Sequence, residues 1–327
     1  MDIERADLPA IACAGILFCT DVHLAGTPPG QRLPGYTEQT LAKLAFCLEQ
    51  AASRNLLPVI CGDLFHWPRE NPNTLLVRCI ELFKPLAATP LKCWVLVGNH
   101  DKWQANYTDD VSMAVLESAG VIHVMKEAGP QCRVLIDGHV ALLGASPDMA
   151  PLPKAVERDE ADTVLWVSHH GLGFPDYADQ RQPLRELPGV DWLINGHLHQ
   201  PQPPQRRGMT TWVNLGSLTR MSFAPRVKER RPAAAIWRPG MTELERLDVP
   251  FLPFEDVFPD QPFPDTQIKE GGESLFLRGL ERLVWKRTRE GAGLGQFLSD
   301  NLDPTLPESQ IILSLYEEII HGGAQND

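Results

Sequence analysis

The sequence lacks the features of a membrane or secreted protein. Among its 327 residues, no apolar run approaches the roughly 20 residues that a membrane-spanning helix needs. The longest early run, residues 11–18, has no basic segment ahead of it, so we expect no signal peptide. Seven cysteines occur singly, without a Cys-x-x-Cys pair, which argues against a disulfide framework or a zinc knuckle. We therefore expect a reduced, cytoplasmic protein that does not contact a membrane.

A surplus of positive charge is also absent, since the formal net charge is -12. A protein this acidic is poorly suited overall to bind nucleic acid. The negative charge is concentrated late in the chain, where residues 251–327 contain 14 acidic and 6 basic residues. Residues 206–231, in contrast, contain seven basic residues and one acidic residue. The net charge therefore disfavours a polyanionic partner only weakly, and the local charge allows one.

Apolar segments and helical patterns alternate over the first 100 residues. The expected strands are 16–20, 57–61 and 93–97, and the expected helices are 40–53, capped by Thr37 or Thr40, and 74–83. This alternation predicts parallel strands joined by right-handed crossovers. Ligands of such sheets bind beyond the carboxyl ends of the strands.

Shorter apolar runs with few helical patterns follow residue 120. They predict strands at 121–124, 133–136, 140–143, 164–167, 192–194, 211–213 and 233–237. We assign these strands to a second sheet packed on the first, which gives a mixed α/β class. Five prolines in residues 250–264 indicate a linker. We thus predict a catalytic domain at 1–250, a proline-rich linker at 251–269 and a small helical C-terminal segment at 270–327.

Polar side chains follow five of the predicted strands, at the points where the strands end. The five clusters are Asp21-x-His23, Gly62-Asp63, Gly98-Asn99-His100-Asp101, His169-His170 and Gly196-His197-x-His199. Taken singly, each has an ordinary structural explanation, such as a turn aspartate or a packed histidine. Because all five lie at strand ends, the fold can bring them together at one edge.

The clusters combine carboxylate oxygens, an amide oxygen and imidazole nitrogens, which suit Mn²⁺, Fe or Zn²⁺ better than Ca²⁺ or Mg²⁺. No cysteine joins them, so a structural zinc site is not expected. Residues two apart, such as His197 and His199, point the same way on extended backbone. Asp63 can bridge two cations through its two oxygens. Two ions about 3.5–4 Å apart can activate a bridging hydroxide for in-line attack on a phosphate.

In this order the five clusters resemble the motifs of the calcineurin-like metallophosphoesterases, over about residues 14–240. The resemblance implies a four-layer α/β/β/α sandwich with two divalent metal ions. It implies that Asp21, His23, Asp63 and His199 hold one ion and that Asp63, Asn99, His169 and His197 hold the other. His100 matches the histidine that protonates the leaving group or stabilises its charge, and Asp101 is expected to orient it. His170 is the alternative to His169 as the ligand, and would otherwise face the substrate or solvent.

The segment from Gly62 to His66 resembles the GDLFH motif of DNA repair nucleases of the SbcD and meiotic-recombination types. Protein phosphatases of the family carry GDxxDRG instead. In the nucleases, the histidine that matches His66 lies over the site and contributes to cleavage. The structural alternative is a turn histidine that packs on Trp67. Residues 212–223 resemble the segment that follows GHxH in the same nucleases, where Ser217 and Arg220 would bind the substrate phosphate.

The sequence therefore predicts a metal-dependent phosphodiesterase, most simply a Mn²⁺-dependent DNA exo- or endonuclease of the SbcD type. The resemblance implies two further contacts, an SMC-like ATPase docked on the helices of 270–327 and a homodimer. A small-molecule phosphodiesterase, acting on a cyclic nucleotide or a nucleotide-diphosphate compound, is the alternative. The acidic charge and the short region after residue 250 favour it. A non-catalytic scaffold is a third hypothesis, which the complete set of ligand types disfavours.

Overall fold

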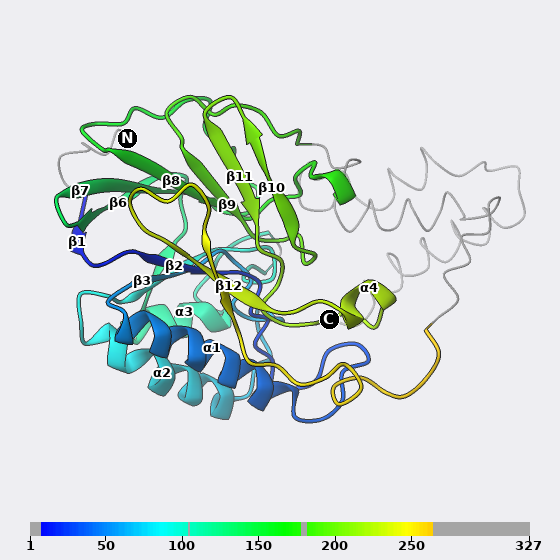
Figure 1. Ribbon diagram of the computed structural model, residues 1–327. Helices are drawn as coiled ribbons and strands as arrows, with labels where there is room; N and C mark the ends of the chain where they lie inside the picture. The colour runs from blue at the N-terminus through cyan, green and yellow to red at the C-terminus, as the bar shows by residue number, and fades with distance from the viewer. Residues whose placement is uncertain (1–7, 104, 178–181, 264–327) are drawn as a thin grey trace, which may run out of the picture. The chain divides into compact units, whose positions relative to one another are not determined.

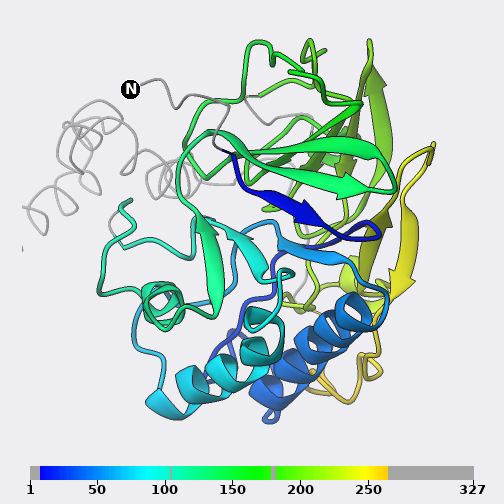
Figure 2. The same ribbon diagram turned by 90° about the vertical axis from the view of Figure 1, so that its left-hand side faces the viewer.

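The computed structural model describes residues 8–103, 105–177 and 182–263, and every structural statement below refers to these residues. Two β-sheets lie face to face, and helices cover the outer face of one of them (Figures 1 and 2). This arrangement confirms the expected mixed α/β class. The predicted helical segment at 270–327 lies outside the described residues, as does the predicted linker beyond Phe263. The predicted domain boundaries stay predictions.

The first sheet has six strands in the order β13-β12-β2-β3-β4-β5. Its strands are β2 (Ile16–Cys19), β3 (Leu57–Ile60), β4 (Cys93–Leu96), β5 (Ile122–Met125), β12 (Ala233–Trp237) and β13 (Glu245–Asp248). Strands β2 to β5 are parallel, as predicted, whereas β12 pairs antiparallel with β2 and β13 antiparallel with β12. Placing β5 and β12 in the second sheet was wrong, because both extend the first sheet, on its two sides.

The second sheet has seven strands in the order β1-β6-β7-β8-β9-β11-β10. Its strands are β1 (Ala10–Ala12), β6 (Gly129–Ile136), β7 (His139–Ser146), β8 (Thr163–Ser168), β9 (Trp192–Asn195), β10 (Gln202–Arg207) and β11 (Thr210–Asn214). Strands β7, β8, β9 and β11 are parallel to one another. The carboxyl ends of β8 and β9 therefore lie at the same edge of this sheet.

The two faces of β8 show how the second sheet is buried on both sides. Leu165 and Val167 join the large core between the sheets, whereas Val164 and Trp166 join a separate cluster on the outer face. Chain segments outside the sheet complete this cluster with residues such as Phe174, beside the 3₁₀ helix η2 (Pro175–Tyr177). Within the described residues, no α-helical side chain belongs to the outer cluster.

Helices α1 (Tyr36–Ser53), α2 (Asn73–Ala87) and α3 (Ser112–Ser118) cover the first sheet, and the short α4 (Pro225–Lys228) follows β11 (Figure 1). Helix α1 begins earlier than predicted. Its N-cap is Gly35, whose φ of 89° is a left-handed conformation that favours glycine. The expected cap at Thr37 or Thr40 is wrong, and the Thr37 hydroxyl instead donates to the Ala25 carbonyl over 2.7 Å. None of the described helices is both long and apolar enough to cross a membrane.

Candidate metal centre

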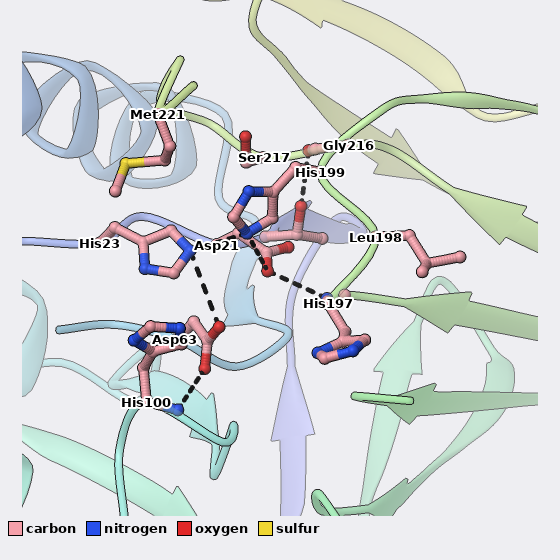
Figure 3. Close-up of polar contacts among 12 residues, drawn as sticks. Asp21, His23, Asp63, His100, His197, Leu198, His199, Gly216, Ser217 and Met221 are labelled. Carbon is pink, nitrogen blue, oxygen red and sulfur yellow. Dashed lines mark hydrogen bonds and ion pairs between the residues drawn. The ribbon is translucent and has the colours of Figure 1, made fainter. Parts of the chain in front are cut away.

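The five predicted clusters lie just beyond the carboxyl ends of β2, β3, β4, β8 and β9. Backbone hydrogen bonds hold the loops after β2 and β3 together beyond the strand ends. The amide of Asp21 donates to the Gly62 carbonyl over 3.2 Å, and the amide of His23 donates to the Asp63 carbonyl over 3.0 Å. The second sheet reaches this edge through His169, whose Nδ1 lies 2.8 Å from the Cys61 carbonyl oxygen. The edges of both sheets therefore meet at one site (Figure 3).

Asp21, His23, Asp63 and His199 form the first ligand group. One potential ligand atom from each residue lies within 4.8 Å of those of the other three. The Nε2 atoms of His23 and His199 are 3.0 Å apart, and Nε2 of His199 is 3.6 Å from Oδ1 of Asp21. These four atoms converge on one point, which is the arrangement that a divalent ion requires.

Asp63, Asn99, His169 and His197 form the second group. Oδ1 of Asn99 lies 3.1 Å from Nε2 of His169 and 2.9 Å from Nδ1 of His197. Oδ2 of Asp63 lies 3.2 Å from Nε2 of His169 and 3.7 Å from Nε2 of His23, a ligand of the first group. Asp63 thus faces both groups, as a bridging ligand must.

Four of these ligands have left-handed backbone conformations. The φ angles are 51° at Asp21, 54° at His23, 52° at Asp63 and 72° at His197. Such conformations cost roughly 1–3 kcal/mol each and collect at functional sites. They turn the chain sharply at the strand ends, and the surrounding hydrogen bonds keep them in place.

The glycines of the clusters leave room for the ligands. A Cβ atom on Gly62 would lie 2.2 Å from Nδ1 of His169, and one on Gly98 would lie 2.2 Å from Oδ1 of Asp63. Both glycines are therefore needed because the backbone approaches the ligands more closely than a side chain permits. The sequence pattern contained these glycines, but only the fold shows which side chains they face.

Burial keeps most of the imidazoles neutral. It lowers the pKa of His199 to about 3, and burial together with His169 lowers the pKa of His197 to about 4. Burial also holds the pKa of His23 well below its usual value. A neutral imidazole presents the lone pair that binds a metal ion.

Charges within the site link the pKa values of Asp21, Asp63 and His169. Burial raises the pKa of Asp21 to about 7, and Asp63 adds to this rise while His169 opposes it. Burial alone would lower the pKa of His169, but the Asp63 carboxylate raises it to about 10. Burial alone would likewise raise the pKa of Asp63, yet His169, His100 and His23 together hold it well below its usual value.

An unpaired atom supports metal binding at this site. Within the described part of the chain, Oδ2 of Asp21 is buried and has no hydrogen-bond partner. An unsatisfied buried carboxylate oxygen is costly unless something binds it. Two divalent cations would satisfy this oxygen and neutralise the two buried carboxylates, so the residues fit the two-metal site that the sequence predicts.

We expect the binding of divalent metal ions to the metal-free protein to strengthen as the pH rises. Asp21, with a pKa of about 7, and His169, with a pKa of about 10, must both lose a proton when the ions bind. Both groups are protonated below pH 7, so the apparent affinity should rise more steeply with pH there than above it. Calorimetry in buffers of different ionisation enthalpy counts the released protons. An affinity that is independent of pH would contradict this protonation scheme.

His66 and His100 lie beside the first ligand group. Their rings stack with centroids 5.1 Å apart, and Nδ1 of His66 is 3.4 Å from Nδ1 of His23. Nδ1 of His100 is 2.7 Å from the His66 carbonyl oxygen, and the amide of His100 donates to Oδ1 of Asp63 over 2.9 Å. The ring of His66 is also 4.4 Å from that of Trp67. His66 therefore both faces the site and packs on Trp67.

Asp101 is buried and holds two loops together. Its carboxylate accepts hydrogen bonds from the amides of Gly98 over 3.0 Å, Phe65 over 3.2 Å and Leu64 over 3.4 Å. Among the described residues, no hydrogen bond joins it to the imidazole of His100. Asp101 thus fixes the loops that carry Asp63 and His100. We had expected Asp101 to orient the His100 imidazole, and its described contacts hold the His100 loop rather than that ring.

His169 and His170 point to opposite sides of the second sheet. His169 contacts Asp63 and Asn99, whereas Nε2 of His170 lies 2.7 Å from the Ala150 carbonyl oxygen. The His170 side chain is buried, and among the described residues no hydrogen bond joins its imidazole to either ligand group. These contacts favour His169 over His170 as a metal ligand, and the burial of His170 does not favour a role in facing the substrate.

Ser217 and Arg220 are more buried than a substrate-binding role suggests. The Ser217 hydroxyl donates to the Thr219 carbonyl over 2.6 Å, and its amide donates to the His199 carbonyl over 3.0 Å. Arg220 is 2% exposed and donates to the Leu252 carbonyl. Arg220 thus holds loops together, while Ser217 remains beside the site through its contact with His199.

Buried basic side chains support the loop from Ser217 to Arg220. The carbonyls of Ser217 and Thr219 accept hydrogen bonds from Arg230, that of Leu218 from Lys43 and that of Arg220 from Arg32. Arg230 belongs to the basic tract that the sequence shows, whereas Lys43 and Arg32 were not predicted to support the site. The position of Lys43 in its helix could have pointed to this role. It lies on the buried stripe of α1, between Thr40 and Cys47, where a lysine needs a hydrogen-bond partner.

Comparisons with known proteins agree with this geometry. The family model described as calcineurin-like phosphoesterase matches residues 14–201, more than half of the chain. A search of the curated proteins found no match.

Several solved structures are similar at low identity. An archaeal phosphodiesterase is 11% identical with a TM-score of 0.36, over 72% of this chain and 99% of that one. A dimetal phosphatase from Danio rerio is 11% identical with a TM-score of 0.40, over 73% and 99% of the two chains. Pseudomonas putida nuclease MPE is 16% identical with a TM-score of 0.32, over 68% and 86%. From the match over residues 14–201, together with the two ligand groups, we conclude that the chain belongs to the calcineurin-like phosphoesterase family.

Proposed function

We propose that this protein is a two-metal phosphodiesterase that cleaves DNA, with Mn²⁺ as its preferred ion. The observation that carries the proposal is the position of His66 and His100, stacked on each other beside the first ligand group. When bound, the two ions supply Lewis-acid charge that activates water as the nucleophile and stabilises the charge on the phosphate. The seven ligand residues named above would hold the ions, and the imidazoles of His66 and His100 would remain for the leaving group.

His100 is the residue that would assist the leaving oxygen. Its Nδ1 is held by the His66 carbonyl, so that Nε2 is the nitrogen left to deliver a proton. Its amide donates to Asp63, which sets the distance between the imidazole and the metal ligands. His66 packs against the same ring and fixes its orientation.

Exposed aromatic side chains favour DNA over a small molecule. Trp67, which contacts His66, is 43% exposed, and Trp103, three residues after His100, is 38% exposed. The guanidinium of Arg69 lies 3.7 Å from the centre of the Trp103 ring. Arg69 covers one face of the Trp103 ring, whereas Trp67 contacts His66 and therefore lies next to the site. An exposed tryptophan in that position can stack on a base of any sequence.

Two other functions remain as alternatives to DNA cleavage: hydrolysis of a small phosphodiester, and a non-catalytic scaffold. Hydrolysis of a cyclic nucleotide or a nucleotide-diphosphate sugar would use the same metals, and such a substrate would offer a single base to the exposed tryptophans. A non-catalytic scaffold would not require both complete ligand groups. Docking of an SMC-like ATPase on residues 270–327 and formation of a homodimer also stay proposals, and the first concerns residues outside the described part of the chain.

A substrate panel with Mn²⁺ tests the proposed function. It contains single- and double-stranded DNA, RNA, a bis-aryl phosphodiester, 3′,5′-cyclic AMP and a nucleotide-diphosphate sugar. We expect cleavage of DNA and, more slowly, of the bis-aryl diester. Turnover of cyclic AMP or the nucleotide sugar without cleavage of DNA would overturn the proposal in favour of the small-molecule alternative. Protein that binds no metal would indicate a scaffold.

Replacing His100 with alanine should slow DNA cleavage by about 10²- to 10⁴-fold, because the leaving oxygen loses its proton donor. The loss should be much smaller for a bis-nitrophenyl diester, whose leaving group departs without a proton. Metal content should stay at two ions per chain, since His100 belongs to neither ligand group. Rates on both substrates and elemental analysis check this prediction. Equal losses on both substrates would show that His100 is not a general acid.

A further inference from the structure

A pocket opens beside the metal ligand His199. Its polar lining includes Tyr177, Ser217, Ser222, Arg226 and Arg230. Figure 3 shows Ser217 and Met221, another lining residue, near His199, whereas His100 lies across the cluster beyond Asp63. The pocket is therefore separate from the side on which the leaving group would be protonated, but it shares a wall with the metal centre.

A buried positive charge lines this pocket. Arg230 is only 7% exposed, and its guanidinium donates to the carbonyls of Ser217 and Thr219. Within the described part of the chain, no carboxylate forms an ion pair with it. Burial and Arg220 lower the pKa of Arg230 to about 10, which leaves it charged at neutral pH. The Asp21 carboxylate attracts Arg230 without forming an ion pair with it. Burial of the cation is still costly, and an anion in the pocket would offset that cost.

A second guanidinium stands at the pocket's rim. Arg226 is exposed and belongs to α4, which is anchored because Val227 packs against Phe254 and Phe258. Arg226 and Arg230 both line the pocket, and the packing of Val227 holds α4, which carries Arg226, in place. Two guanidiniums with a nearby serine hydroxyl match the oxygens of a phosphate, the anion that arginine pairs bind best.

We propose that this pocket binds a second phosphate group of the substrate, distinct from the phosphate that is cleaved at the metal centre. The inference rests on the proposed phosphodiesterase function and narrows its substrate class. A polynucleotide carries a further phosphate along its chain, whereas a cyclic mononucleotide carries only one. The pocket thus selects substrates with at least two phosphates.

Dinucleotides that differ by one phosphate test this pocket directly. The substrates are a dinucleotide without a terminal phosphate and the same dinucleotide with a 5′- or a 3′-phosphate. We expect the wild type to prefer one of the phosphorylated forms on the order of 10-fold in kcat/KM, from charge-assisted hydrogen bonds to the added group. In Arg226→Gln the preference should fall to near one. The matched control Arg206→Gln, an exposed arginine on β10, should keep it.

Salt dependence supplies a second readout. On a longer oligonucleotide, the slope of log KM against log salt should decrease by about 1 in Arg226→Gln, because one phosphate contact is lost. Equal rates of the wild type on all three dinucleotides would overturn the inference. A preference that survives in Arg226→Gln would also overturn it.

A binding experiment separates this inference from the nuclease function. Calorimetry on the Mn²⁺-loaded protein compares adenosine 3′,5′-bisphosphate with adenosine 5′-monophosphate. Tighter binding of the bisphosphate that Arg226→Gln abolishes would support the pocket even if no DNA is cleaved. Equal binding of the two nucleotides would exclude the pocket even if DNA is cleaved.

Discussion

Replacing Asp63 with asparagine should reduce phosphodiester cleavage by at least about 10³-fold and lower the metal content below two ions per chain. Oδ2 of Asp63 is 3.2 Å from Nε2 of His169 and 3.7 Å from Nε2 of His23, which belong to different ligand groups. An amide has one oxygen acceptor and no negative charge, so it cannot bridge two cations. The loss of the carboxylate also removes the partner that raises the pKa of His169 to about 10. Rates on a DNA substrate and elemental analysis measure both effects.

Asp137→Asn is the matched control for this substitution. Asp137 has a left-handed φ of 47°, close to the 52° of Asp63, but it is exposed in the turn between β6 and β7. The control therefore makes the same chemical change on the same backbone conformation, away from the metals. We expect wild-type rates and full metal content. Near wild-type cleavage by Asp63→Asn would remove Asp63 from the mechanism and, with it, the bridging role.

Replacing Gly62 with alanine should lower the affinity for metal by at least about 10- to 100-fold, with cleavage falling in parallel. The new methyl group would lie 2.2 Å from Nδ1 of His169 and 2.7 Å from its Cγ. His169 is fully buried and is held by the Cys61 carbonyl and by Asp63, so its ring can move only by leaving the second ligand group. Metal titration of the folded variant measures the loss.

Gly138→Ala separates this collision from backbone strain. Gly138 has a φ of 84°, near the 92° of Gly62, but a Cβ atom there would meet nothing within 4 Å. It should therefore show only the strain of a left-handed alanine, about 1–2 kcal/mol of unfolding free energy, with metal binding intact. If Gly62→Ala behaves like Gly138→Ala, contact with His169 does not determine the site.

Much of the fold could be predicted because apolar periodicity is a local signal. The strands that were missed, β1, β10 and β13, all lie at sheet edges. Strand β10 has the sequence Gln-Pro-Pro-Gln-Arg-Arg, which reads as a turn, and proline is tolerated there because an edge strand needs few ladder donors. Which sheet a strand joins was harder to predict, since β12 returns to pair with β2 across more than 200 residues.

The sequence by itself determined which residue types follow the strands and in which order, and hence the family and the seven metal-ligand candidates. Only the tertiary structure decided which neighbour faces the metals. Strand β8 is apolar on both faces, so the sequence pattern could not show which face turns toward the first sheet. In the structure, His169 follows the inner face of Leu165 and Val167. His170 follows the outer face of Trp166. Likewise, Arg220, Arg230 and the exposed Arg226 belong to one basic tract in the sequence. Their separate roles depend on burial and contacts, because the buried Arg220 holds loops together, the buried Arg230 supports a loop and also lines the pocket, and Arg226 is exposed at the rim of that pocket. Burial results from contacts between distant segments, which no local pattern records.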